Sequence, residues 1–163
     1  MAVFVDLQGF KNSGNKFIIK ELAGIRLLNP SAHFCWCFKS PFPWHELEAN
    51  YQSMNSWCTR CYHGIPWDDG CIPYDQLESK FKEVLENTKK IYVKGYEKKI
   101  WIEELTRIPV INLKDLECPA LFQLRTLPYK PHKEHHSKHL KNYHCAFENA
   151  QRMRAWFIEN WMT

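Results

Sequence analysis

The chain has 163 residues, 45% of them hydrophobic and 25% charged, which predicts one folded domain spanning residues 1–163. No stretch of about 18 apolar residues occurs, and residues 1–20 lack the apolar segment of a signal peptide. We therefore expect an intracellular protein, nuclear or cytoplasmic, that does not engage a membrane. The net charge of +4 is too small to indicate a nucleic-acid partner by itself.

The composition is unusual in its content of aromatic residues, cysteine and histidine. Aromatic residues make up 15% of the chain and include seven tryptophans, which predicts a dense core or an exposed binding surface. Seven cysteines, an odd number, argue against a disulfide framework in a chain without a secretory signal. Together with eight histidines, they favour metal binding instead.

The first part of the chain predicts an antiparallel meander followed by a less regular segment. Residues 3–7 are an apolar run typical of a buried strand, and residues 17–25 form a second strand after a turn. Residues 33–38 alternate between large apolar side chains and His or Cys, the period of a third strand. Short connections make these strands antiparallel neighbours. A short helix is expected over residues 44–53 and a loop over residues 57–73.

The rest of the chain alternates helices with strands. Helical spacing of apolar residues predicts helices over 77–85, 97–105 and 146–161, and short apolar runs predict strands over 91–93 and 110–113. Three hairpin-connected strands followed by β-α-β crossovers predict an α/β fold with a mixed five-stranded sheet and helices on its faces. This order of elements matches the ribonuclease H-like fold.

Two short motifs resemble those of the DEDDh 3′–5′ exonucleases, a ribonuclease H-like family. Asp6, on the first strand, stands where the family's opening Asp-x-Glu motif has Asp, but Gln8 replaces the Glu. His144 and Asn149 resemble the closing His-x4-Asp motif, with Asn in place of Asp. The middle Asp of the family is expected after the fourth strand, where this chain offers Glu97 among lysines.

The departures from the exonuclease motifs indicate a degenerate catalytic site. Two-metal catalysis needs several carboxylates to hold divalent ions about 3.5–4 Å apart, and Mg²⁺ or Mn²⁺ prefers anionic oxygen ligands. The neutral amides at Gln8 and Asn149 remove two charges. The alternative is an active metal-dependent 3′–5′ exonuclease or ribonuclease with an unconventional site, for which Asp6, Glu21, Glu97 and His144 are candidates.

A second group of residues has the chemistry of a zinc site. Cys118 follows the last predicted strand and Cys145 precedes the last predicted helix, and a His-rich segment lies between them. Thiolate and imidazole are the ligands of tetrahedral zinc, and a structural site needs four. His132 with His135, or with His136, completes such a set. A structural Zn²⁺ would also explain a long irregular segment inside a small domain.

These residues resemble the zinc site of the Maelstrom domain, a ribonuclease H-like domain that lost the DEDDh carboxylates. The resemblance implies Cys118, His132, His135 and Cys145 as ligands, with His132 where that domain usually has Cys. It also implies a link to small-RNA (piRNA) silencing of transposons. The segment over residues 62–70 resembles a stretch found in small exonuclease-like proteins of arthropods.

The Cys58-x2-Cys61 pair is a second, weaker metal candidate. It would need Cys35 and Cys37 to complete a ligand set, and buried free thiols are the alternative interpretation. A redox role requires such a pair at a strand-to-helix turn, which the sequence does not predict here.

A basic stretch between residues 125 and 141 is the sequence's candidate for nucleic-acid contact. Lysine and arginine side chains with flanking tyrosines can follow a phosphate backbone and stack on bases. A solvated charged surface is the alternative. The candidate residues are Arg125, Lys130, Lys133, Lys138 and Lys141.

The sequence thus supports three hypotheses. The first is a catalytically degenerate, zinc-containing domain that binds RNA, single-stranded nucleic acid or a protein. The second is the active nuclease described above. The third is a protein-interaction adaptor that uses exposed aromatic side chains, for which the candidates are Trp36, Trp57, Trp67 and Trp161.

Overall fold

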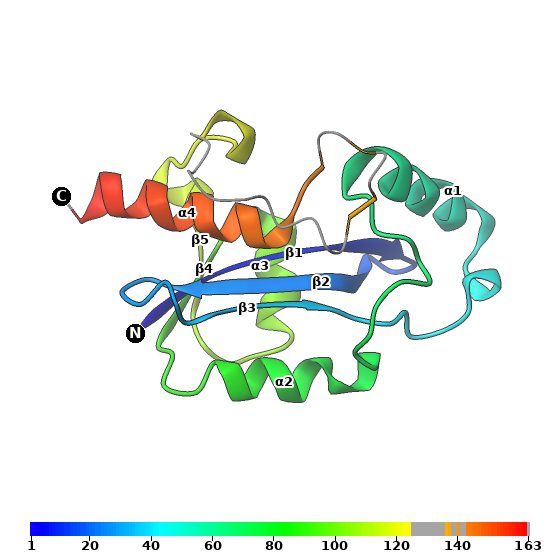
Figure 1. Cartoon of the computed structure of the whole chain (residues 1–163), viewed down its shortest axis with the longest axis horizontal. Helices are drawn as coiled ribbons and strands as arrows, with labels where there is room; N and C mark the ends of the chain where they lie inside the picture. Colours follow the sequence, from blue (N-terminus) through cyan, green and yellow to red (C-terminus); the bar gives the residue numbers. More distant parts are fainter. Residues whose placement is uncertain (125–135, 138–139, 141–142, 163) are drawn as a thin grey trace.

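The computed structural model describes residues 1–124, 136–137, 140 and 143–162, and its central feature is a mixed five-stranded sheet (Figure 1). The strands lie in the order β3-β2-β1-β4-β5, with β2 antiparallel to both β1 and β3, and with β4 and β5 parallel to β1 and to each other. Their bounds are β1 Ala2–Asn12, β2 Lys16–Arg26, β3 His33–Cys37, β4 Lys90–Val93 and β5 Val110–Asn112.

Four α-helices accompany the sheet in the part of the chain that is described. They are α1 Ala49–Trp57, α2 Leu77–Val84, α3 Tyr96–Glu103 and α4 Ala146–Trp161. The predicted α/β architecture, the meander and the mixed sheet are confirmed. None of the helices is long and apolar enough to cross a membrane in the described residues.

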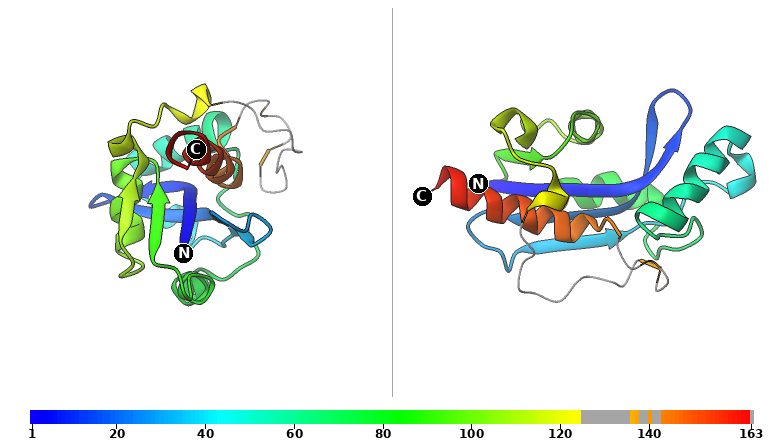
Figure 2. Two further views of the ribbon diagram at one scale, coloured as in Figure 1. Left: turned by 90° about the vertical axis from the view of Figure 1, so that its left-hand side faces the viewer. Right: turned by 90° about the horizontal axis from the view of Figure 1, so that it is seen from above.

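The two faces of the sheet carry different helices, as Figures 1 and 2 show for α2 and α4. Alternate residues of β1 separate the two faces, because successive side chains of a strand point in opposite directions. Val3, Val5 and Leu7 pack with Phe81 of α2 and with Ile102 of α3. The other face packs against α4, which covers Phe4 and Asp6 of β1, whereas Phe10 further along the strand packs with Leu47 and Trp67.

The α4 face combines an apolar end with a polar end. Phe4 packs against Phe157 and Met153 of α4, with the Phe4 and Phe157 rings 5.5 Å apart in an edge arrangement. Further along the same face, β1 places Asp6 and then Gln8, both buried. Burying polar side chains in this position is costly unless they find partners, so this end of the face is the place to look for function.

Two sequence predictions need correction in the segment after the meander. The helix predicted over 44–53 begins only at Ala49, because residues 47–48 are extended after a short 3-10 turn at Trp44–Glu46. The loop predicted from residue 57 is helical at first: α1 continues into a π-helical turn over Cys58–Tyr62. The Cys58-x2-Cys61 pair therefore lies on a helical turn.

The first strand is also longer than predicted. It continues past residue 7 to Asn12, so Asp6 lies inside the strand and not at its end. The extension contains an irregularity between Gln8 and Gly9, where the pairing with β2 shifts by a residue. Bulges of this kind re-aim side chains, and this one separates the polar part of the α4 face from the hairpin tip.

Candidate metal centre

Strand pairing brings three polar side chains of β1 and β2 to one place on the α4 face. Asp6 is opposite Ala23, and Gln8 is opposite Glu21, so Asp6, Gln8 and Glu21 share a face. Glu21 is fully buried. Charged residues are almost never fully buried without partners, and Glu21 finds its partners at the start of α4.

Glu21, His136 and Cys145 form a buried cluster of three possible metal ligands. One ligand atom from each lies within 4.8 Å of the ligand atoms of the other two. His136 Nε2 is 3.1 Å from Glu21 Oε2, and the backbone N–H of Ala146 donates to Glu21 Oε1 at 2.6 Å. Carboxylate oxygen, imidazole nitrogen and thiolate sulfur are all ligands of Zn²⁺.

A hydrogen bond to the loop after α1 orients the His136 ring. Its Nδ1–H donates to the carbonyl of His63, which leaves Nε2 directed at the Glu21 carboxylate. Ligating histidines usually donate their second nitrogen to a carbonyl in this way. Although burial lowers the pKa of His136, the Glu21 carboxylate and the His63 carbonyl outweigh it and raise the pKa above the ordinary histidine value.

The loop that accepts this hydrogen bond is itself tied to β1. Its Gly64 has a φ of 70°, a left-handed conformation that favours glycine, and the Gly64 carbonyl accepts from Ser137 N–H at 2.6 Å. The His63 ring bridges Gly9 and Ile65, with Nε2 donating to the Gly9 carbonyl at 2.9 Å and Nδ1 accepting from Ile65 N–H at 3.0 Å. Burial lowers the pKa of His63 to about 4, so this ring stays neutral.

Cys145 is a buried thiol that a bound cation would convert to a thiolate. It is fully buried at the N-terminal boundary of α4. Burial raises the pKa of the Cys145 thiol strongly, and the Glu21 carboxylate raises it further. A bound Zn²⁺ would deprotonate such a thiol, since the ion is the largest local charge. Cys35 is a fourth candidate, with its Sγ 4.0 Å from Glu21 Oε2.

The Asp6 carboxylate lies on the same face, but other side chains bind both of its oxygens; we call it closed for this reason. Lys98 of α3 places its ammonium 2.5 Å from Asp6 Oδ1. Asn149 of α4 donates from Nδ2 to Asp6 Oδ2 at 2.9 Å. A lysine and an amide thus take the positions around Asp6 that cations or their ligands would need.

His144, another of the exonuclease-like motif positions, lies near Asp6 and Lys98. Its ring stacks on Tyr62 at 4.0 Å, and its backbone N–H donates to the Tyr62 carbonyl. Burial lowers the pKa of His144, and the Lys98 ammonium adds to that effect. The structure therefore brings Asp6, His144 and Asn149 together as the sequence motifs suggested, while Glu97 is exposed on α3.

Only part of the zinc set predicted from the sequence is found in the buried cluster. Cys145 belongs to it, and so does His136, the alternative to His135. Cys118 does not: its side chain packs with Phe4 and Tyr92 in the apolar cluster under α4. His132 and His135 lie outside the described residues.

The remaining sequence candidates have mixed outcomes. The basic residues proposed for nucleic-acid contact, Arg125, Lys130, Lys133, Lys138 and Lys141, all lie outside the described residues. Among the adaptor candidates, Trp57 and Trp161 are half exposed, but Trp67 is buried against Phe10, contrary to the expectation. Trp36 is partly buried against the core.

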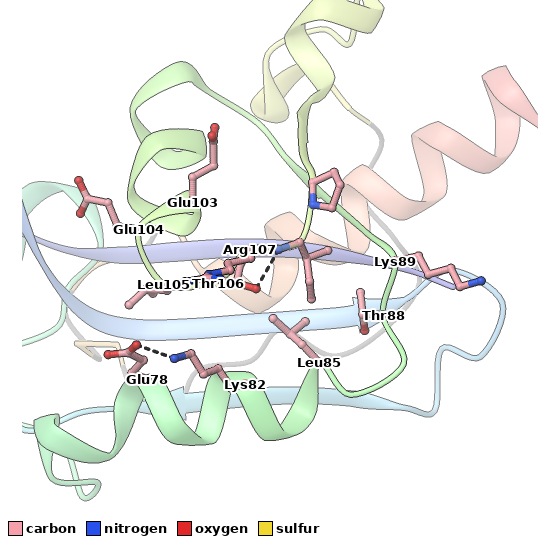
Figure 3. A pocket seen from close by; sticks show the side chains of 12 residues that line it. Glu78, Lys82, Leu85, Thr88, Lys89, Glu103, Glu104, Leu105, Thr106 and Arg107 are labelled. Carbon is pink, nitrogen blue, oxygen red and sulfur yellow. Dashed lines mark hydrogen bonds and ion pairs between the residues drawn. The ribbon is translucent and has the colours of Figure 1, made fainter.

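A large surface groove lies far from this chemistry, between α2 and the segment that joins α3 to β5 (Figure 3). It encloses about 850 Å³. Its charged side chains are surface groups, and Glu78 and Lys82 form an ion pair with each other. The buried polar residue in its lining, Thr88, already accepts a hydrogen bond from Arg26 at 3.3 Å, so we assign the groove no chemistry.

Neither the models of known protein families nor the curated proteins match this chain.

Proposed function

We propose that this chain is a non-catalytic domain of ribonuclease H-like fold, of the degenerate exonuclease kind, that holds a structural zinc ion and binds RNA or single-stranded nucleic acid. The observation that carries the proposal is the closure of Asp6 by Lys98 and Asn149. The strand order, with β1 between an antiparallel meander and two parallel strands, is consistent with that fold. The Maelstrom resemblance adds a role in piRNA silencing of transposons as part of the proposal.

The closed Asp6 argues against two-metal catalysis. Two divalent ions need several carboxylates around them, and here the side chains that contact Asp6 are an ammonium and an amide. Glu21, the next carboxylate on this face, is turned to Ala146 N–H and His136. An ammonium 2.5 Å from Asp6 would also repel an incoming Mg²⁺.

The buried cluster supports zinc. Glu21, His136 and Cys145 would hold the ion, and Cys35 or one of the histidines outside the described residues would complete a tetrahedral set. Since Glu21 belongs to β2 and Cys145 precedes α4, the bound ion would tie the sheet to the last helix. The ion would act as a structural cross-link between these elements and not as a catalyst, because a structural site with four protein ligands has no open coordination position for a substrate.

One pair of assays distinguishes the nuclease hypothesis from the binding hypothesis. Purified protein is incubated with fluorescein-labelled oligouridylate in Mg²⁺ or Mn²⁺ to follow cleavage, and binding is measured by anisotropy over a salt series. We expect no cleavage, together with binding that weakens as salt increases. Cleavage that EDTA and Asp6→Ala both abolish would establish the nuclease instead. Absence of binding at low salt, where electrostatic contacts are strongest, would leave the protein-interaction adaptor.

A further inference from the structure

A cleft between β1, the start of α3 and the end of α1 has a lining unlike that of the surface groove. It encloses about 580 Å³, within the range of small-ligand pockets. We call it the β1–α3 cleft, and its key residues are Gln8, Trp57, Lys94, Tyr96 and Trp101. It opens beside the closed Asp6 pair, because Lys98 lines it as well.

Aromatic side chains form much of the wall of this cleft. Trp101 stacks on Phe17 with ring centroids 4.0 Å apart, and this pair forms a fixed surface. Trp57 and Tyr96 stand on the rim and are 50% and 70% exposed. Large aromatic side chains left exposed around a concavity are typical of binding sites, and planar rings are the partners that they stack against.

The start of α3 provides the features of an anion site. Gly95 precedes the helix with a φ of 120° and has no atoms within 4 Å of the position where a Cβ would stand, so the approach is open. The first backbone N–H groups of a helix lack partners within the helix and attract phosphate. Lys94 and Lys11 add positive charge to the same cleft, and Glu97 contributes one negative charge at its rim.

Gln8 supplies an independent sign that a ligand is needed. It is 3% exposed, and its side-chain Nε2 has no hydrogen-bond partner among the described residues. An unpaired buried amide costs free energy, and this one lines the cleft. A ligand with an acceptor at this depth would satisfy it.

We propose that the β1–α3 cleft binds one nucleotide unit, with its phosphate at the start of α3 near Lys94 and its base against the aromatic wall. The inference rests on the proposed nucleic-acid binding and assigns it to described residues, which are different from those of the basic segment that the sequence favoured. A nucleotide unit has an anionic phosphate, a planar base and hydrogen-bonding groups, which match the start of α3 with its lysines, the aromatic wall and Gln8. Cleavage does not follow, because the neighbouring Asp6 is closed.

The experiment uses two probes on the full chain. Adenosine 5′-monophosphate is titrated by NMR chemical-shift changes, and labelled oligouridylate of about ten nucleotides by anisotropy. Trp57→Ala and Lys94→Ala are compared with Trp161→Ala and Lys89→Ala, which remove a similarly exposed tryptophan and a lysine outside the cleft. We expect Trp57→Ala to weaken both probes about tenfold, the size of one lost stacking contact. Lys94→Ala should weaken both probes most at low salt, where a lysine–phosphate contact is strongest, and both controls should leave binding unchanged.

A buried-site variant refines the assignment. Gln8→Met keeps the length of the side chain but removes the amide, and it should weaken the mononucleotide while the NMR spectrum confirms folding. Oligonucleotide binding that ignores every cleft variant would overturn the cleft assignment and leave the proposed function standing. Mononucleotide binding in the cleft without any oligonucleotide binding would overturn the proposed function and retain the site. Failure of the mononucleotide to shift any cleft resonance would overturn the inference.

Discussion

Two buried carboxylates on neighbouring strands, Asp6 and Glu21, have opposite surroundings. Asp6 is paired with the Lys98 ammonium and accepts a hydrogen bond from the Asn149 amide nitrogen, and neither of these donor groups can coordinate a metal at neutral pH. Glu21 faces the imidazole of His136 and the thiol of Cys145, and both of these become ligands by releasing a proton. The comparison teaches that a buried carboxylate marks a metal site only when its neighbours can also coordinate.

The largest expected effect is loss of the metal. Cys145→Ser should abolish bound zinc in elemental analysis and destabilise the protein by about 4 kcal/mol or more, the stabilisation given by a ligand at about a thousand times its dissociation constant. Glu21→Gln should do the same, although the amide keeps the volume of the side chain. Thermal denaturation with and without EDTA measures the effect, and EDTA should lower the Tm of the unmodified protein alone.

Two cysteine variants make this test specific. Cys61→Ser changes an exposed thiol and should retain zinc and stability. Cys118→Ser distinguishes the two ligand sets: it should retain zinc if the buried cluster is the site, and lose zinc if the set expected from the sequence is right. Absence of zinc from every preparation, with unchanged stability in EDTA, would contradict the metal centre.

The next effect concerns the closed carboxylate. Lys98→Ala removes one member of a buried pair and should cost about 3 kcal/mol, near the lower end for such changes because Lys98 is 21% exposed and Asn149 remains. Lys98→Met, which keeps most of the side-chain length, separates lost charge from lost packing. Urea denaturation measures both variants, and a cost below about 0.5 kcal/mol would show that the pair behaves like a surface ion pair.

Reopening the Asp6 site sharpens the comparison further. Gln8→Glu alone adds a carboxylate but leaves the lysine, so we expect no Mn²⁺ binding. Combined with Lys98→Ala and Asn149→Asp, it surrounds Asp6 with acids and should create Mn²⁺ binding detectable by paramagnetic broadening of nearby resonances. Binding by the single variant would mean that Lys98 does not close the site.

Acidification should act through His63, which links the metal cluster to β1. The unfolded chain takes up a proton at this histidine near pH 6.5, whereas burial lowers the pKa in the folded protein to about 4. The unfolded state therefore binds more protons between these values, and stability falls as pH decreases from about 6.5 to 4, by roughly 3 kcal/mol. An NMR titration of the His63 ring measures its pKa directly.

A matched variant isolates this contribution. His63→Gln can still donate to the Gly9 carbonyl and accept from Ile65 N–H, but it has no titratable group. Its stability, measured by urea denaturation in EDTA so that metal release does not contribute, should depend less on pH in the same window. An unchanged dependence, or a His63 ring that titrates near 6.5, would contradict the assignment.

The sequence predicted the elements whose spacing is unambiguous and missed those set by tertiary packing. Ala146–Trp161 was predicted with its correct bounds, because its apolar residues recur at helical spacing. The extension of β1 to Asn12 was missed, since Gly9, Lys11 and Asn12 resemble a turn. They form a strand because β2 pairs with them.

The candidate site was predictable only in part for a related reason. Cys145 and a histidine near position 136 could be proposed from residue type, but Glu21 was considered only for a nuclease site. It joins the cluster because the β1–β2 register places it opposite Gln8 on the α4 face, and register is not written in local spacing. The useful signal was an acid in the interior of a largely apolar strand, where its only charged neighbour in sequence is Lys20. Cys118 lies outside this cluster and packs among apolar side chains, as buried free thiols commonly do, so its place in the predicted zinc set stays a prediction.

The smallest effect is expected in the surface groove of Figure 3. Glu78 and Lys82 form an i,i+4 ion pair at 2.8 Å, but both side chains are 59% exposed. Lys82→Ala should therefore change stability by less than about 0.5 kcal/mol, in contrast to Lys98→Ala, and it should leave nucleotide binding unchanged. Urea denaturation and the anisotropy assay test both statements. A loss of nucleotide binding in Lys82→Ala would assign the binding site to this groove instead of the β1–α3 cleft. Lys82 is exposed and paired with Glu78, so its removal can weaken binding only if the ligand contacts the groove.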